Sequence, residues 1–173
     1  MNQRLLYLVI IVLFFNCKGE QKLALESTAV ISGGGIDIPV YDFESFQPLL
    51  KVNDGKTRVI NFWATWCKPC VAELPFFELI NGKYKDGGVE VILVSLDLPK
   101  HVETKLIPFI RKQRIESRVL LLDDPDANNW IPKVNKTWSG SIPATIIYKG
   151  NNSSFYERSF TYDELEKELK KVL

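Results

Sequence analysis

A buried strand that leads into a pair of cysteines constrains this chain more than any other feature. The run Val59-Ile60-Asn61-Phe62-Trp63 is rich in β-branched and aromatic side chains, which is typical of a central strand buried on both faces. Trp66-Cys67-Lys68-Pro69-Cys70 follows shortly after it, so we expect the strand to carry the first cysteine to the N-terminus of a helix. Unpaired N–H groups and the helix dipole favour an anion there. A thiol in that position has a lowered pKa and is a nucleophile, so the pattern predicts reversible dithiol–disulfide chemistry.

The spacing of the two cysteines indicates a different role for each. Cys67, at the start of the helix, is expected to be the exposed thiol that attacks a substrate disulfide. Cys70 lies one turn further into the helix and is expected to be the buried thiol that resolves the mixed disulfide. Pro69 stiffens the small ring between them, and Lys68 adds a positive charge that favours a thiolate.

Four other interpretations of the cysteine pair stay open at this point. A zinc site needs about four ligands, and one Cys-x-x-Cys pair with the single histidine, His101, does not supply the usual set. A static disulfide closing so short a loop would remove little chain entropy. A thiol peroxidase on the same fold would usually carry Thr-x-x-Cys, but Thr65 lies only two residues before Cys67. A redox-inert binding module would use the same groove only to hold a partner.

Length and composition limit the remaining possibilities. With 173 residues, 46% of them hydrophobic, the chain can build one well-buried core. Its 22 basic and 21 acidic residues give a net charge of +1, which gives no indication of nucleic-acid binding. The chain has three cysteines, so one, Cys17, is left outside the pair.

The N-terminus is expected to direct the chain out of the cytosol. Residues 1–17 read as an export signal, because the uncharged run Leu5 to Phe15 is 11 residues long and a membrane-spanning helix needs roughly 20. Cys17 stands where a bacterial lipoprotein carries its lipid, although Asn16 replaces the usual small residue, and we expect lipidation of Cys17. A plain cleaved signal peptide or a short membrane anchor are the alternatives. Residues 18–35, which end in three glycines, are expected to form a flexible tether.

Residues 36–173 are predicted to form one α/β domain. Apolar and polar patterning alternates between strands and helices and ends in a hairpin, which predicts a mixed central β-sheet flanked by helices on both faces. The expected strands cover residues 36–41 (a short edge strand), 58–63, 89–96, 118–122, 144–148 and 155–160. The expected helices begin near residues 42, 67, 102, 126 and 161, the last with a capping box at Thr161 and Glu164.

Three segments together resemble the TlpA/ResA-like thioredoxin family of exported, membrane-tethered thiol–disulfide oxidoreductases. The segment from Asn61 to Cys70 is very similar to the family's active site. Pro75, five residues after the second cysteine, matches the proline that kinks the helix in thioredoxins. Ser141-Ile142-Pro143-Ala144-Thr145 matches the loop whose proline is cis in that fold. The resemblance implies a thioredoxin fold, a redox-active cysteine pair and no cofactor or metal.

The resemblance also implies roles for residues around the cysteines. The cis Pro143 would leave the backbone of Ile142 free to pair with an extended substrate, and Trp66 would shape the surface on which partners dock. Glu73 matches a glutamate that such proteins place three residues after the second cysteine. It would take the proton that Cys70 loses, or else it is an ordinary glutamate facing solvent.

The resemblance further implies a direction of electron flow and a set of partners. The pair Lys68-Pro69 is closer to reducing thioredoxins than to oxidising proteins, which tend to carry histidine in the second of these positions. The chain is therefore expected to reduce disulfides of exported proteins, such as apocytochromes, in the periplasm. Its electrons would come from a membrane thiol reductase, and its N-terminus would hold it to the membrane.

Overall fold

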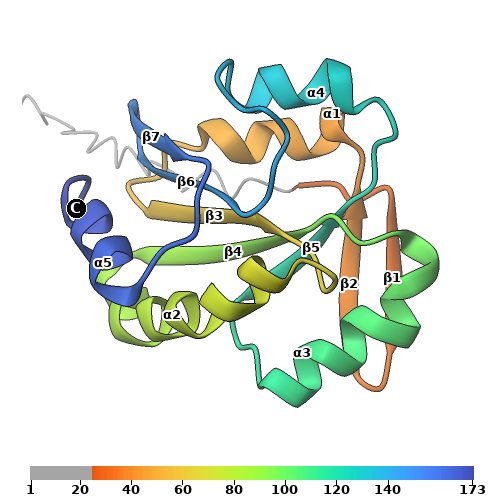
Figure 1. Cartoon of the computed structure of the whole chain (residues 1–173). Coiled ribbons are helices and arrows are strands. Elements are labelled where there is room, and N and C mark those ends of the chain that lie inside the picture. Colours follow the sequence, from red (N-terminus) through yellow and green to blue (C-terminus); the bar gives the residue numbers. More distant parts are fainter. Residues whose placement is uncertain (1–24) are drawn as a thin grey trace, which may run out of the picture.

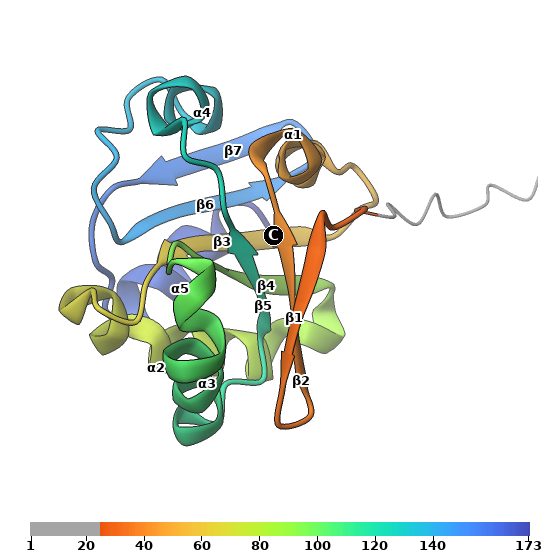
Figure 2. The same cartoon turned by 90° about the vertical axis from the view of Figure 1, so that its right-hand side faces the viewer.

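Seven strands in one mixed sheet form the central layer of the computed structural model, which describes residues 25–173 (Figures 1 and 2). The strands are β1 (Ala29–Gly33), β2 (Ile36–Tyr41), β3 (Thr57–Trp63), β4 (Val89–Ser95), β5 (Arg118–Leu122), β6 (Ala144–Lys149) and β7 (Asn152–Tyr156). The predictions for residues 1–17, including lipidation of Cys17, lie outside the described residues.

The strand order places β3 and β4 in the interior of the sheet. The order is β1-β2-β5-β4-β3-β6-β7. The pairs β2–β5, β5–β4 and β4–β3 are parallel, whereas β1–β2, β3–β6 and β6–β7 are antiparallel. Because β3 pairs on both sides and every one of its residues is buried, its C-terminal end is a fixed point from which the cysteine segment leaves the sheet.

Helices cover both faces of this sheet, as Figure 1 shows. The helices are α1 (Phe43–Phe46), α2 (Lys68–Tyr84), α3 (Ile107–Gln113), α4 (Ala127–Val134) and α5 (Tyr162–Lys170), with short 3₁₀ segments η1 (Gln47–Lys51), η2 (Lys85–Gly87) and η3 (Pro99–His101) and a π-helical turn η4 (Val102–Leu106). Helices α1 and α4 lie on one face, and α2, α3 and α5 on the other. The predicted α/β class with a mixed central sheet is therefore confirmed.

Strand β3 contributes to both hydrophobic cores because successive side chains of a strand point to opposite faces. Val59 and Trp63 join the core beneath α2, α3 and α5, while Ile60 and Phe62 join the core beneath α1 and α4. The same alternation turns Asn61 toward α2. A polar side chain is thereby placed at the centre of an otherwise apolar strand, on the face that carries the cysteine helix.

The predicted tether is wrong for its last residues. Ala29–Gly33 form strand β1, which pairs along its length with β2, so the folded domain begins before residue 36. Gly34 and Gly35, with φ angles of 55° and 81°, form the turn between the two strands. Such angles favour glycine, so part of the glycine run read as a linker is a hairpin turn. Strand β2 is consequently covered by β1 and is not the expected edge strand.

The C-terminal part follows the prediction except for the bounds of its last strand. Thr161 and Glu164 form the expected capping box, since each side chain accepts from the other's backbone N–H. The strand expected over residues 155–160 runs instead from Asn152 to Tyr156, because the turn at Gly150 lets pairing with β6 begin at once. Leu165 and Leu169 are fully buried, but Leu173 is 48% exposed because α5 ends at Lys170.

Candidate active site

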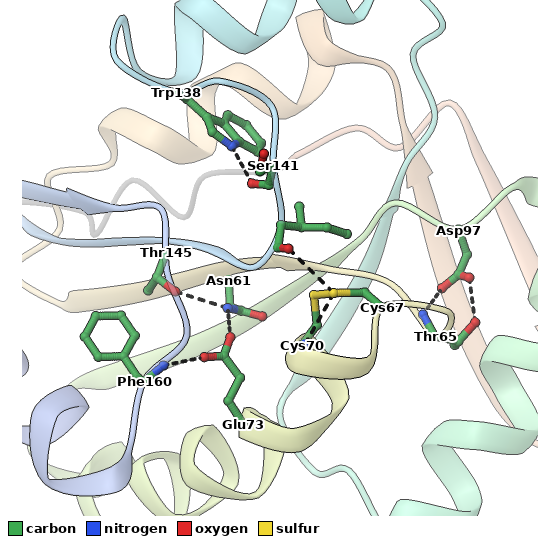
Figure 3. Close-up of a disulfide and its surroundings, with 11 residues drawn as sticks. Asn61, Thr65, Cys67, Cys70, Glu73, Asp97, Trp138, Ser141, Thr145 and Phe160 are labelled. Carbon is green, nitrogen blue, oxygen red and sulfur yellow. Dashed lines mark hydrogen bonds between the residues drawn. A yellow bond between two sulfur atoms is a disulfide. The ribbon is translucent and has the colours of Figure 1, made fainter.

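The disulfide between Cys67 and Cys70 lies at the N-terminus of α2 (Figure 3). Cys67 is the N-cap residue, and its Sγ accepts a hydrogen bond from the backbone N–H of Cys70 at 3.3 Å. The positive end of the helix dipole acts on the same sulfur. Once the disulfide is reduced, both effects favour negative charge on Cys67 Sγ, which is the condition for a nucleophilic thiolate.

Cys67 is more accessible than Cys70, as predicted, although both cysteines are buried. Cys70 is completely buried, and Cys67 is 6% exposed. The expectation of an exposed Cys67 is therefore wrong for the disulfide form, because the loop before β6 lies against its sulfur. Lys68 and Pro69, between the two cysteines, are exposed.

The loop before β6 lies beside the disulfide. The Ile142–Pro143 peptide bond is cis, as the resemblance implied. The carbonyl oxygen of Ile142 lies 3.7 Å from Cys67 Sγ. Pro143 is buried and Ile142 half-buried. The backbone of Ile142 therefore covers one side of Cys67 Sγ.

Trp138 and Glu157 hold this loop through hydrogen bonds. Trp138 donates from Nε1 to the carbonyl oxygen of Ser141 at 2.8 Å. The carboxylate of Glu157 accepts the backbone N–H groups of Ser139 and Ser141, each at 3.1 Å. The hydrogen bond from the Ser139 hydroxyl is the main cause that lowers the pKa of Glu157. Both sides of the Ser141 peptide are thus fixed immediately before Ile142.

Glu73 is buried, which excludes the alternative that it faces solvent. Its residue is 1% exposed, and burial raises its pKa from 4.5 to about 7. One carboxylate oxygen accepts from Asn61 Nδ2 at 3.0 Å and the other from the backbone N–H of Phe160 at 2.7 Å. Both hydrogen bonds oppose the shift without cancelling it. Glu73 therefore titrates near neutral pH.

Asn61 links Glu73 to the sheet. Its Nδ2 also lies 3.1 Å from Thr145 Oγ1 on β6. Its Oδ1 is buried and has no hydrogen-bond partner among the described residues. A carboxamide can present either its donor or its acceptor after a rotation, so Asn61 can face Glu73 in the ionised or the protonated form. Asn61 thus makes a buried polar contact with the glutamate.

Asp97 is a further residue that the sequence analysis missed. It follows β4, is 2% exposed, and accepts from Thr65 through both the backbone N–H (3.0 Å) and the hydroxyl (2.6 Å). Ser95 donates a third hydrogen bond from Oγ at 2.9 Å. Figure 3 shows Thr65 and Asp97 on the side of the disulfide opposite Glu73. The sequence could have indicated Asp97, because parallel pairing of β3 with β4 brings together the residues that follow the two strands.

Trp63, Trp66 and Trp138 differ in exposure. Trp66 is 66% exposed beside Cys67, whereas Trp63 is fully buried and packs on Phe109. Trp138 is 5% exposed, so it belongs to the core while bonding the loop before Ile142. His101 is half-buried in η3 and receives no role.

Residues 25–173 contain no group of three or more His, Cys, Asp or Glu side chains placed to hold a metal ion. Over the same residues, no helix is both long and apolar enough to cross a membrane.

Comparison with known families identifies the fold and the family. A profile of the AhpC/TSA family matches residues 43–152. Over 116 residues the chain is 35% identical to the thiol-disulfide oxidoreductase ResA of Oceanobacillus iheyensis, covering 65% of this chain and 55% of that protein. The ResA of Geobacillus kaustophilus is 38% identical over 76 residues, or 43% and 44% of the two chains. The chain thus spans about half the length of these curated relatives, and the predicted resemblance to ResA-like proteins is confirmed.

Solved structures support the fold. A thiol:disulfide interchange protein of the thioredoxin family from Chlorobium tepidum superposes with a TM-score of 0.58 at 21% identity, covering 73% of this chain and 83% of that one. A secreted disulfide oxidoreductase of Mycobacterium tuberculosis gives 0.54 at 21% identity, with 80% and 90% covered. The predicted thioredoxin fold is confirmed.

The raised pKa of Glu73 makes stability depend on pH. The folded state holds this proton up to about pH 7, while the unfolded state releases it near 4.5, so the free energy of unfolding falls as pH rises through this interval. We compare the free energy of unfolding of the unaltered disulfide form with that of its Glu73→Gln variant. The value for the unaltered chain minus the value for the variant is expected to fall by on the order of 2–3 kcal/mol from pH 5 to pH 8.5. Urea unfolding at several pH values measures it. Glu103→Gln, at an exposed position, is the control, and a constant difference for Glu73→Gln would contradict the prediction.

Proposed function

The chain belongs to the AhpC/TSA family, and we propose that it is a thiol–disulfide oxidoreductase that reduces disulfides of other proteins through Cys67 and Cys70. One observation carries the proposal. Cys67 Sγ lies at the N-terminus of α2 and accepts a hydrogen bond from a backbone N–H, while Cys70 is completely buried. An attacking thiol needs the first arrangement, and a resolving thiol is protected by the second. The ResA proteins, named as thiol-disulfide oxidoreductases, support the same activity.

The reaction proceeds by two thiol–disulfide exchanges. The Cys67 thiolate attacks one sulfur of the substrate disulfide, forming a mixed disulfide and releasing the other substrate sulfur as a thiolate. The Cys70 thiolate then attacks Cys67 Sγ, closing the Cys67–Cys70 disulfide and releasing the second substrate thiolate. Two electrons pass to the substrate, and the two protons of the original dithiol end on its thiols.

We assign to Glu73 the proton that Cys70 loses. Glu73 lies three residues after Cys70 and therefore on the same face of α2. Its pKa of about 7 lets it accept and release a proton near neutral pH. Asn61, bonded to its carboxylate at 3.0 Å, supports either protonation state by rotating its carboxamide.

Cys70→Ser tests the exchange mechanism. With insulin as substrate and dithiothreitol as reductant, the unaltered chain is expected to accelerate reduction and Cys67→Ser to abolish the acceleration. Cys70→Ser should accumulate a mixed disulfide on Cys67, because the resolving sulfur is gone, and mass spectrometry detects it. Cys17→Ser, which leaves the pair intact, is the matched cysteine control.

Two outcomes would contradict the proposal. Consumption of peroxide without disulfide reduction would indicate a thiol peroxidase. Partner binding that is unchanged in Cys67→Ser, with no exchange in the unaltered chain, would indicate a redox-inert binding module.

We propose that electrons flow toward the substrate, from a membrane thiol reductase through this chain. Lys68 and Pro69 between the cysteines support a reductant. The reduction potential of the Cys67–Cys70 pair measures this directly. A value near about −270 mV, that of thioredoxin, is expected, and one near about −120 mV, typical of a strong oxidant, would reverse the direction.

The proposed location rests on the N-terminal sequence, and the proposed partners rest on the resemblance to ResA-like proteins. We propose an exported, periplasmic protein held to a bacterial membrane by a lipid on Cys17, acting on disulfides of exported proteins, with apocytochromes among the candidates. The export signal over residues 1–17 and the persistence of disulfides outside the cytosol support this.

Cys17→Ser tests the lipid. The variant is expected to move from the membrane fraction to the soluble fraction, because a lipid chain supplies the membrane affinity. Fractionation of cells that express either form measures the partition. Unchanged membrane association would indicate an uncleaved apolar anchor instead.

A further inference from the structure

The peptide group between Ser159 and Phe160 has a charged side chain at each end. Its N–H donates to Glu73 Oε2 at 2.7 Å (Figure 3), and its carbonyl oxygen accepts from Arg158 Nη1 at 3.0 Å. The peptide is trans, so its N–H and C=O lie in one plane and point in opposite directions. The two hydrogen bonds therefore connect the guanidinium of Arg158 to the carboxylate of Glu73 through a single peptide group.

This arrangement favours the ionised form of Glu73. A guanidinium that donates to a carbonyl oxygen polarises the peptide, and the N–H at the other end becomes a stronger donor. Burial raises the pKa of Glu73, and both the Phe160 N–H and, to a smaller extent, the charge of Arg158 lower it. The peptide and the charge thus act in the same direction.

Arg158 is held in this position from two further sides. Its guanidinium lies over the ring of Phe160, 4.2 Å from the ring centroid, and Phe160 is itself buried in the core beneath α2, α3 and α5. Its Nη1 also lies 3.1 Å from Glu164 Oε1, and Glu164 is fixed by its capping-box contacts with Thr161. The guanidinium is therefore placed by the fold, although the side chain is 43% exposed.

The other groups around Glu73 are neutral or bonded elsewhere. Asn61 reaches it from β3 and is bonded in turn to Thr145 on β6, and neither side chain titrates. Cys70, one turn earlier on α2, is closed in the disulfide. The titratable groups on β7 and α5 are bonded away from Glu73, Glu164 to Arg158 and Thr161, and Glu168 to Tyr156 and Lys171. Among the described residues, Arg158 is thus the one charged side chain that acts on this carboxylate.

We propose that Arg158 is a positioning residue for proton transfer at Glu73. It holds and polarises the peptide N–H that bonds the carboxylate, so that the carboxylate is ionised and ready to accept the proton of Cys70. The inference rests on the proposed function, in which Glu73 takes this proton, and adds the residue that prepares it. In the step itself, the Cys70 proton passes to a Glu73 oxygen, the Cys70 sulfur attacks Cys67 Sγ, and the substrate sulfur leaves as a thiolate.

Arg158→Gln tests the inference, with Arg158→Lys to restore the charge and Arg118→Gln as the matched control. Arg118 is a similarly exposed arginine (41%) that also pairs with a glutamate, Glu90, and it does not act on Glu73. The first measurement is the titration of Glu73 in the disulfide form of the full chain. Carbon NMR with isotope-labelled glutamate carboxyls follows it, and the resonance missing in Glu73→Gln identifies the residue.

The midpoint of this titration should rise by about 0.5 pH unit in Arg158→Gln, the size expected for the loss of one half-exposed charge. Arg158→Lys should keep the midpoint near that of the unaltered chain, because the ammonium group retains the charge, and Arg118→Gln should leave it unchanged. An unchanged midpoint in Arg158→Gln, or an equal rise in either of the other two variants, would overturn the inference.

A kinetic measurement connects the titration to the reaction. The reduced chain is mixed with a symmetric nitroaryl disulfide, which releases one coloured thiolate when Cys67 attacks it and a second when Cys70 resolves the mixed disulfide. The pH midpoint of the second phase should rise in Arg158→Gln by the same amount as the NMR midpoint. The first phase should keep its pH dependence, because the proton that Glu73 takes belongs to Cys70. General damage to the fold would change both phases and would count against the inference.

The two measurements separate this inference from the proposed function. A raised NMR midpoint in Arg158→Gln, with no disulfide exchange in the unaltered chain, supports the action of Arg158 on Glu73 and overturns only the oxidoreductase function. Disulfide exchange with both midpoints unchanged in Arg158→Gln overturns the inference alone. A raised NMR midpoint with an unchanged second phase would mean that Glu73 does not take the Cys70 proton, which overturns the role in proton transfer.

Discussion

The N-cap position of α2 supplies the interaction on which the site depends. The first N–H groups of a helix have no partner within the helix, and here the N–H of Cys70 points at the sulfur of Cys67. That geometry exists only because β3, buried along its whole length, ends a few residues earlier and delivers the cysteine to the helix. A strand fixed between two neighbours and a helix packed on one face of the sheet therefore define where the reactive sulfur lies.

Two buried carboxylates complement that junction in different ways. Asp97 accepts three hydrogen bonds and anchors the turn before Cys67. Glu73 accepts two, from Asn61 and Phe160, and burial raises its pKa to about 7. The first carboxylate gives the site its shape, and the second gives it a group that exchanges a proton at neutral pH. Their different partners account for the different roles.

The loop before β6 closes the site from the other side. Ser141 is held by Trp138 through its carbonyl oxygen and by Glu157 through its N–H, so the Ile142 carbonyl oxygen is fixed near Cys67 Sγ. Cys67 Sγ thus lies between this loop and the turn that Asp97 anchors. The hydrogen bonds on both sides thus fix the surroundings of the Cys67–Cys70 disulfide.

The sequence by itself determined the cysteine chemistry, the alternation of strands and helices, and the capping box of α5, because these depend on residues close together in the chain. Tertiary structure decided what depends on distant segments. Glu73 is buried because Asn61 and the Phe160 backbone meet it, and Asp97 joins the site only through the pairing of β3 with β4. The glycine run at residues 33–35 looked like a linker, since glycine serves linkers and tight turns alike. Only the pairing of β1 with β2 distinguishes the two.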